Sequence, residues 1–258
     1  MTQEKKPRII LWDLETSPFL AYGFTFYDYS LNGDMVKIED SLICASWKVL
    51  GEKEVHAISI ADDKKRYKKN PYDDYYVVSE LRKVLVESDA LIAHYGDKFD
   101  RKRFNDFLIR NKLEPLPPII TIDTHKIAKQ HFHFKNNRLD YLGQFLGLGR
   151  KTKMSFDVWK RCMEGDEKAV KEMVDYNKQD VKLLEEIYLK ISPFSPTTKL
   201  NMNLFSDVPV CSLCKSINYH FRGYGYTNTG KHRRFQCKDC GKWNRLTKNE
   251  PSEREMLK

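Results

Sequence analysis

Four acidic residues and one tyrosine stand in three short segments that lie far apart in the sequence. They are Asp13, Glu15, Asp100, Tyr176 and Asp180. Hydrolysis of a phosphodiester is accelerated when two divalent cations, about 3.5 to 4 Å apart, hold the phosphate. Mg²⁺ and Mn²⁺ prefer carboxylate oxygens, so such a site must gather acidic residues from distant parts of a chain. These segments are therefore candidates for a two-metal site.

Each segment also has a purely structural interpretation. In a strand that continues through Asp13-Leu14-Glu15, period-two alternation places both carboxylates on one face and the leucine on the other. Asp100 stands near the start of a predicted helix, where aspartate is favoured as a capping residue. A spacing of four puts Tyr176 and Asp180 on one helix face, but ordinary helical sequence gives the same pattern. One segment alone does not define a site.

Taken in order, the three segments resemble the motifs of DEDD-class 3′→5′ exonucleases, in particular the proofreading domains of family B DNA polymerases and their stand-alone phage-type relatives. The resemblance covers about residues 8–191. It consists of D-x-E-T from Asp13, a glycine-containing loop that ends in F-D at Asp100, and Y-x-x-x-D from Tyr176. The other subclass has histidine where Asp175 stands, so the tyrosine subclass is indicated. The resemblance implies an α/β, RNase H-like fold, in which a mixed sheet carries helices on both faces.

The resemblance also implies a role for each residue. Asp13 would bridge two Mg²⁺ or Mn²⁺ ions, and Glu15 and Asp180 would complete one of the two metal sites. Asp100 would serve the other site, largely through water, and Tyr176 would orient the attacking water. The likeness to polymerase domains favours DNA over RNA as the substrate, with single-stranded 3′ ends preferred.

Aromatic side chains outside these motifs are candidates for contacts with unpaired bases. Tyr95 stands where the second motif commonly has an asparagine that contacts substrate, so this departure concerns substrate binding more than the chemistry. An insert after the first strand is also rich in aromatic residues, and stacking contributes roughly 1 to 3 kcal/mol per base. We expect a hairpin that packs most of these rings on the core and leaves one or two for substrate. The rings are Phe19, Tyr22, Phe24, Phe26, Tyr27 and Tyr29.

Other acidic and histidine residues have simpler interpretations. Asp123, Asp157 and Asp166 stand at predicted helix starts, where aspartate caps a helix. His131 and His133 have no matching third ligand, so we expect them to face solvent.

Four of the six cysteines form two C-x-x-C pairs with 22 residues between them. They are Cys211, Cys214, Cys237 and Cys240. This spacing is typical of a zinc ribbon, in which two knuckles joined by a β-hairpin hold one structural Zn²⁺. A redox dithiol or a chance cluster is the alternative. Cys44 and Cys162 stand alone, and we expect both to be buried as small hydrophobic side chains.

The segment between the two cysteine pairs mixes cations with aromatic residues. Its cations are Arg222, Lys231, Arg233 and Arg234, and its aromatic residues include Tyr219, Phe221, Tyr224, Tyr226 and Phe235. This mixture suits a phosphate backbone with exposed bases. The competing interpretation is a docking module for a replication, repair or transcription protein.

Hydrophobic periodicity predicts the elements that must position these residues. Three strands are expected first, then alternating helices and strands, and finally a series of helices. The expected strands are 8–13, 41–50, 54–60, 90–93 and 119–122, and the expected helices are 74–87, 100–111, 124–130, 138–146, 156–163 and 167–191. This order is that of the RNase H-like fold.

The composition indicates one α/β domain with a small basic appendage. The 258 residues have a net charge of +9, and the part from Lys199 onward holds 12 Lys and Arg against 5 Asp and Glu. This excess favours a polyanionic partner, although a solubility bias gives the same numbers. Residues 192–209 interrupt the last helix, so we expect a nuclease domain at 1–191, a linker at 192–208, the ribbon at 209–248 and a polar tail at 249–258.

The sequence thus predicts a metal-dependent 3′→5′ exonuclease, a phosphodiester hydrolase that binds nucleic acid. The alternatives are a structure-selective endonuclease on the same fold and a non-catalytic nucleic-acid-binding adaptor, although the intact acidic residues argue against an adaptor. No segment approaches the roughly 20 apolar residues of a membrane span, and Met1 to Arg8 is polar. We therefore expect a cytoplasmic protein, either bacterial or phage-encoded.

Overall fold

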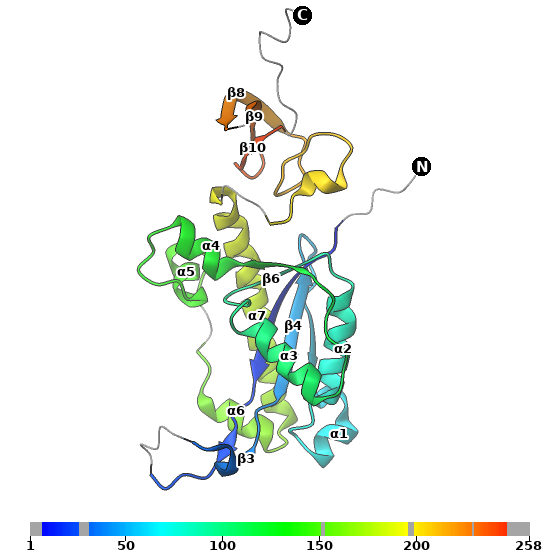
Figure 1. Cartoon of the computed structure of the whole chain (residues 1–258). Helices are drawn as coiled ribbons and strands as arrows, with labels where there is room; N and C mark the ends of the chain where they lie inside the picture. The colour runs from blue at the N-terminus through cyan, green and yellow to red at the C-terminus, as the bar shows by residue number, and fades with distance from the viewer. Residues whose placement is uncertain (1–6, 26–30, 151–152, 196–198, 229, 247–258) are drawn as a thin grey trace, which may run out of the picture. The chain divides into compact units, whose positions relative to one another are not determined.

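The computed structural model of the chain describes residues 7–25, 31–150, 153–195, 199–228 and 230–246 (Figure 1). The chain divides into two compact units, one of Arg8–Lys126 with Lys135–Ile187 and one of Met1–Pro7, Ile127–Phe134 and Tyr188–Lys258. The strands are β1 (Ile9–Thr16), β2 (Leu20–Ala21), β3 (Val36–Ile38), β4 (Leu42–Val49), β5 (His56–Ser59), β6 (Ala90–Ala93), β7 (Ile120–Asp123), β8 (Tyr219–Thr227), β9 (Gly230–Cys237) and β10 (Trp243–Arg245). The α-helices are α1 (Lys64–Lys69), α2 (Tyr75–Val86), α3 (Asp100–Arg110), α4 (Thr124–His131), α5 (Leu139–Phe145), α6 (Phe156–Met163) and α7 (Glu167–Ile191). Short 3₁₀ helices occupy Gly33–Met35, Ile60–Asp62, Ser192–Phe194 and Met202–Phe205.

The first unit is built on a mixed sheet of five strands in the order β5-β4-β1-β6-β7. β1 pairs antiparallel with β4, and β4 pairs antiparallel with β5, which confirms the expected three-strand meander. β1, β6 and β7 are parallel, so their carboxyl ends meet at one edge of the sheet. The tight β4–β5 turn contains Gly51 at φ 84°, a conformation that glycine adopts without strain.

The two faces of the sheet carry different helices, as Figure 1 shows. Ile10, Trp12 and Leu14 of β1 pack in one cluster with buried side chains of α2 and α3. A second cluster joins β4 to α6 and α7 through side chains that include Ile43, Cys162 and Val170. The alternation along β1 therefore separates an apolar face from the face that carries Asp13 and Glu15, as predicted.

Helix α7 is the longest element and supplies part of the site. Its apolar positions recur every three to four residues and are buried, including Val170, Met173, Val181, Leu184 and Ile187. The Glu185 carboxylate forms a buried ion pair with Lys48 of β4 and accepts a hydrogen bond from the Gly51 amide at 3.0 Å. These contacts fix α7 against the sheet. The helix ends at Ile191, as predicted from the Ser-Pro sequence that follows.

The aromatic insert after β1 differs from the expectation. β2 and β3 do form a small antiparallel hairpin. Its aromatic residues, however, are exposed instead of packed on the core: Phe19 is 48 % exposed, Tyr22 64 % and Phe24 94 %. The prediction of core packing was wrong for these three, because β2 is only two residues long and both of them are exposed. Phe26, Tyr27 and Tyr29 lie outside the described residues.

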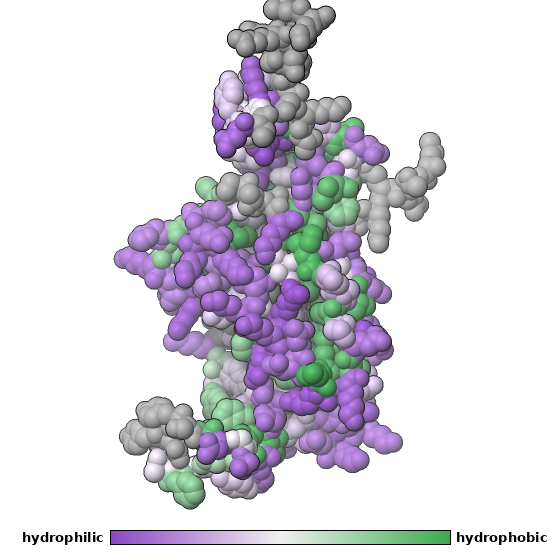
Figure 2. Space-filling view, in the orientation of Figure 1, coloured by the Kyte–Doolittle hydropathy of each residue, from purple (hydrophilic) through white to green (hydrophobic). Residues whose placement is uncertain are grey.

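Hydrophilic side chains cover most of the face seen in Figure 2, including the region of α5. Within the described part of the chain, no helix is both long and apolar enough to cross a membrane.

The second unit contains a three-stranded antiparallel sheet in the order β10-β9-β8. β8 and β9 form the hairpin that was expected between the two cysteine pairs. The predicted boundaries of the linker, ribbon and tail stay predictions.

Candidate active site and cysteine cluster

Three of the predicted acidic residues converge on the face of the sheet that is covered by α7. One carboxylate oxygen from each of Asp13, Glu15 and Asp180 lies within 4.8 Å of the other two. Asp13 and Glu15 come from the carboxyl-terminal half of β1, and Asp180 comes from the middle of α7, where it is only 1 % exposed. A 25-residue helix and a central strand are rigid supports, so the carboxylates are held in place by the fold.

A buried amide on α7, which the sequence interpretation missed, supports this group. The Asn177 Nδ2 donates a hydrogen bond of 2.7 Å to the Asp13 Oδ2, and the side chain is completely buried. Its Oδ1 atom is also buried and has no hydrogen-bond partner among the described residues. Asn177 stands three residues before Asp180, and this spacing is the signal that places both on one face of the helix.

The surroundings of the carboxylates are buried as well. Cys44 and Ser46 of β4 stand opposite Glu15 and Asp13 in the β1–β4 register. Burial raises the pKa of the Cys44 thiol well above its usual value, and the neighbouring Glu15 carboxylate raises it further. Three carboxylates in such a setting repel one another, and a bound cation would relieve this repulsion.

Asp100 is the first residue of α3 and is 3 % exposed. The residue in the N-cap position is Phe99, so Asp100 is not the capping residue of the helix. A Cβ atom placed on Gly96 would lie 2.3 Å from the Ala93 Cβ and 3.6 Å from the Asp100 Oδ2, so only glycine allows this close approach of the loop. Asp100 is not part of the group formed by Asp13, Glu15 and Asp180. The close approach of the loop at Gly96 positions Asp100 in the first turn of α3.

The two candidate tyrosines occupy different settings. Tyr176 lies on α7, one turn before Asp180, and is half-buried against the cluster that contains Val170. Tyr95 lies in the loop after β6, with 41 % of its surface exposed and a φ of 65°, which is unusual for a residue other than glycine. The Asp123 carboxylate accepts a hydrogen bond of 2.9 Å from the Tyr95 amide, and the His125 ring lies 4.9 Å from the Tyr95 ring.

The remaining acidic residues lie at helix starts, as predicted; of the two histidines expected to face solvent, His133 is exposed, whereas His131 is half-buried. The Asp123 Oδ1 also accepts from the His125 amide at 2.9 Å, which caps α4. Asp166 caps the start of α7 through the Lys168 amide, and Asp157 lies in the first turn of α6. Among the described residues, His131 and His133 join no group that could hold a metal ion.

The residues present fit the cations that the acidic group would hold. Mg²⁺ and Mn²⁺ bind oxygen ligands at about 2.1 Å, so oxygens on one ion are about 3 to 4 Å apart. Three carboxylates within 4.8 Å of one another need only small side-chain movements to reach this geometry. The buried Oδ1 of Asn177 is a further oxygen beside the group. The donor set is hard and anionic, as these ions require.

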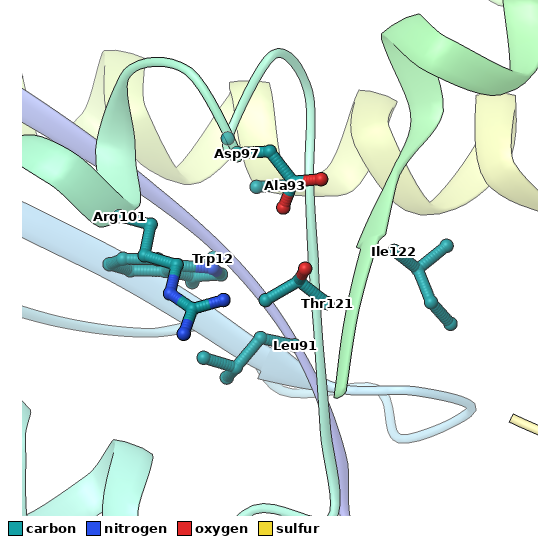
Figure 3. Close-up of a pocket in the computed structure, with 8 residues that line it drawn as sticks. Trp12, Leu91, Ala93, Asp97, Arg101, Thr121 and Ile122 are labelled. Carbon is teal, nitrogen blue, oxygen red and sulfur yellow. The ribbon is translucent and has the colours of Figure 1, made fainter. Parts of the chain in front are cut away.

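A pocket lies on the opposite face of the sheet, beneath the loop after β6. It is lined by Trp12, Leu91, Ala93, Gly96, Asp97, Arg101, Thr121 and Ile122 and has a volume of about 10 Å³ (Figure 3). Figure 3 shows Arg101 extending past Trp12 on one side. No residue of the acidic group lines it, and its volume holds about one water molecule. This pocket is therefore separate from the candidate active site.

The four paired cysteines come together in the second unit. Their sulfur atoms all lie within 4.8 Å of one another, with 3.5 Å between Cys211 and Cys240 and 3.6 Å between Cys214 and Cys237. A tetrahedral zinc site with bonds of about 2.3 Å separates its sulfur atoms by about 3.8 Å. The geometry is therefore compatible with one Zn²⁺ held by four thiolates, as in a zinc ribbon.

The two turns that carry these cysteines have the same backbone pattern. The Cys211 amide donates to the Ser216 carbonyl at 2.9 Å, and the Cys237 amide donates to the Lys242 carbonyl at 2.9 Å. The fourth residue after each of these cysteines, Lys215 or Gly241, has a positive φ and donates back to the cysteine carbonyl. Two matched turns are the arrangement expected of a pair of zinc knuckles. Cys44 and Cys162 are buried elsewhere, as predicted.

The four cations predicted to bind nucleic acid all lie on the β8–β9 hairpin and are exposed. They do not share one surface. Lys231 and Arg233 lie on one face of β9, and Arg234 lies on the other. Arg222 lies where the β8–β9 register shifts, and its guanidinium donates to the His220 ring.

The comparison with known proteins agrees with this architecture. No curated protein sequence matches the chain. The family described as the RNase H superfamily matches residues 50–192, which is more than half of the chain. The matched range contains Asp100, Tyr176 and Asp180, together with three of the five strands of the sheet, β5, β6 and β7. With its mixed five-stranded sheet and flanking helices, the chain belongs to the RNase H superfamily.

Proposed function

We propose that the protein is a divalent-metal-dependent 3′→5′ exonuclease, acting on DNA in preference to RNA and on single-stranded 3′ ends. Membership of the RNase H superfamily indicates a nuclease-type function. The observation that carries the finer proposal is the convergence of Asp13, Glu15 and Asp180 within 4.8 Å, on a face that also holds Tyr176 one turn away on α7. This combination corresponds to the tyrosine subclass that the sequence motifs resemble.

The proposed roles follow from where each side chain lies. Asp13, Glu15 and Asp180 would hold Mg²⁺ or Mn²⁺, which when bound supplies Lewis-acid activation of water and neutralises charge on the phosphate. Asp100, outside this group, would act through water. Asn177 would keep the Asp13 carboxylate in position through its hydrogen bond. The Tyr176 hydroxyl would orient the attacking water.

The exposed residues near the ends of β1 and β6 are candidates for substrate contacts. Tyr95 is fixed by Asp123 and packs beside His125, so its exposed ring is held ready to contact a terminal base. Phe19, Tyr22 and Phe24 follow β1 directly in the sequence and are exposed. These rings lie in the same unit as the acidic group.

The test is digestion of oligonucleotides labelled at the 5′ or the 3′ end, single- and double-stranded, DNA and RNA, with Mg²⁺ or Mn²⁺. We expect 5′-labelled DNA to shorten one nucleotide at a time, and 3′-labelled DNA to release labelled mononucleotide at once. Asp13→Ala and Asp180→Asn should each lose nearly all activity, whereas Tyr176→Phe should lose less because it removes no metal ligand.

The matched control is Asp157→Asn, which removes an exposed carboxylate from α6 and should change the rate less than about twofold. Internal fragments from both labels would identify an endonuclease instead. Near-normal turnover by Asp13→Ala would remove the basis of the proposal.

A further inference from the structure

The β8–β9 hairpin carries positive charge and no acidic residue along its length. From Tyr219 to Cys237 the sequence contains four Lys and Arg and neither Asp nor Glu. The first acidic residue after the hairpin, Asp239, accepts hydrogen bonds from Ser216 and Asn218 at the knuckles. The hairpin surface therefore complements a polyanion.

The strand register sorts the side chains of the hairpin into two faces. Tyr226 pairs with Lys231, Tyr224 with Arg233 and Phe221 with Phe235, and residues paired directly across two strands share a face. We name the exposed members of this set the ladder face: Phe221, Tyr224, Tyr226, Lys231 and Arg233.

The opposite face is organised differently. The Arg234 side chain lies across Gly225, because a Cβ atom on that glycine would be 3.1 Å from the Arg234 Cδ. The Arg234 guanidinium lies 5.5 Å from the centre of the Trp243 ring. Arg233 and Arg234, although adjacent in β9, therefore lie on opposite faces of the hairpin. The Arg234 side chain is occupied by its contacts with Gly225 and Trp243.

On the ladder face, cations stack on rings in a regular way. The Lys231 Nζ lies 4.2 Å from the centre of the Tyr224 ring, and the Arg233 guanidinium lies 4.2 Å from that of Phe221. The rings remain accessible, with 43 % of Phe221, 37 % of Tyr224 and 76 % of Tyr226 exposed. Phe221 also packs on Tyr219 and Phe235, but the exposed surface of the three rings stabilises no contact within the module, so we attribute it to binding.

We infer that the ladder face binds single-stranded nucleic acid, with bases stacked on Tyr224 and Tyr226 and with Lys231 and Arg233 beside the phosphates. Exposed rings select unpaired bases, since the bases of a duplex are already stacked on one another. Planar guanidinium groups can also stack on unpaired bases. The inference concerns a binding surface apart from the acidic group, and it does not require that the chain hydrolyses its ligand.

The test compares variants of the full-length, zinc-loaded chain by fluorescence anisotropy with a 5′-labelled oligothymidylate. Neither Mg²⁺ nor Mn²⁺ is added, so the oligonucleotide stays intact, and no chelator is used. Tyr224→Ala with Tyr226→Ala should weaken binding about tenfold or more, because stacking on two rings is lost. The matching double substitution to Phe keeps both rings and should bind within about twofold of the wild type.

The adjacent arginines provide the matched pair. Arg233→Ala should weaken binding and reduce the slope of log affinity against log salt by about 0.7, the value for one phosphate contact on a single strand. Arg234→Ala should leave both within error. Zinc content, measured for every variant, shows that the ribbon is folded.

Equal losses from Arg233→Ala and Arg234→Ala would overturn the assignment of faces. Wild-type affinity of the double alanine variant would overturn the inference and leave a protein as the better partner for the ladder face. A chain that digests DNA but shows this insensitivity would contradict the inference alone, and the proposed nuclease activity would stand.

Discussion

Substitution of Asn177 by alanine tests whether this residue holds the metal-binding carboxylates in place. Asn177→Ala removes the donor of a 2.7 Å hydrogen bond to the Asp13 carboxylate, inside a fully buried environment. Hydrogen bonds to charged groups contribute about 1.5 to 3 kcal/mol. At about 1.4 kcal/mol per tenfold, the loss corresponds to roughly 10- to 150-fold. Mutation of a residue that hydrogen-bonds to a metal ligand typically lowers metal affinity by 10- to 100-fold, which agrees with this estimate.

The assay is nuclease activity as a function of Mg²⁺ concentration. We expect the concentration that gives half-maximal activity to rise about 10- to 100-fold in Asn177→Ala, with much of the rate recovered at high Mg²⁺. Recovery is expected because the carboxylates themselves are intact.

The matched control is Asn111→Ala. The Asn111 Nδ2 donates a hydrogen bond of 2.8 Å to the Asp74 carboxylate, at the end of α3 and apart from the acidic group. This variant should lose stability in thermal unfolding but keep the Mg²⁺ requirement of the wild type. An unchanged Mg²⁺ requirement in Asn177→Ala, or an equal shift in both variants, would refute the reasoning.

Three further predictions concern the fold around the two sites. Lys48→Met should lower the free energy of unfolding in urea by about 3 kcal/mol, because it leaves the buried Glu185 carboxylate without its cation; adding Glu185→Met should recover part of this loss. Asp123→Ala should cost about 1 to 2 kcal/mol in the same assay, since it removes the cap of α4. At pH 8, iodoacetamide should modify four thiols after zinc is chelated but spare Cys44 and Cys162, because burial raises the pKa of Cys162 to about 12 and that of Cys44 well above its usual value. Since pH 8 lies below these raised pKa values, both thiols stay protonated and unreactive.

Each of these outcomes can be contradicted. Equal stability of Lys48→Met and the wild type would mean that the buried pair contributes nothing. An unchanged unfolding free energy for Asp123→Ala would show that the α4 cap is dispensable. Modification of six thiols in the folded, chelated chain would show that Cys44 and Cys162 are accessible.

The elements with strong periodicity and clear breakers could be predicted from the sequence. The strand at Ala90–Ala93 and the helices Phe156–Met163 and Glu167–Ile191 have the predicted bounds. Helix α1 was missed because its six residues contain one apolar side chain, Tyr67, and so show no period. A hairpin was expected in the insert after β1, but the bounds of its strands could not be predicted, because β2 and β3 are only two and three residues long.

The candidate site could be predicted where the period of a strand or helix determines which way its side chains point. Alternation in β1 and the spacing on α7 bring Asp13, Glu15 and Asp180 together. The role of Asn177 depends on a contact between residues that are 164 positions apart, and an amide on a helix gives no distinctive signal by itself. The position of Asp100 depends on how closely the loop approaches Ala93 at Gly96, which spacing does not encode.

In the ribbon, too, only the features that depend on local sequence could be predicted. The cysteine spacing predicted a four-sulfur cluster and a hairpin, because both follow from local sequence. Alternation separates Arg233 from Arg234, but the position of Arg222 depends on the shift in register between Phe221 and Tyr224. Four cations that stand close in the sequence therefore do not form one surface.

The central claim is that the acidic group holds divalent cations, and the most direct measurement is an anomalous difference map from crystals soaked in MnCl₂. We expect a Mn²⁺ peak beside carboxylate oxygens of Asp13, Glu15 and Asp180, and a second peak about 3.5 to 4 Å from the first. Both peaks should be absent from crystals of Asp13→Ala. A map from the wild-type protein without a peak at these three carboxylates, or with Mn²⁺ bound elsewhere, would contradict the account.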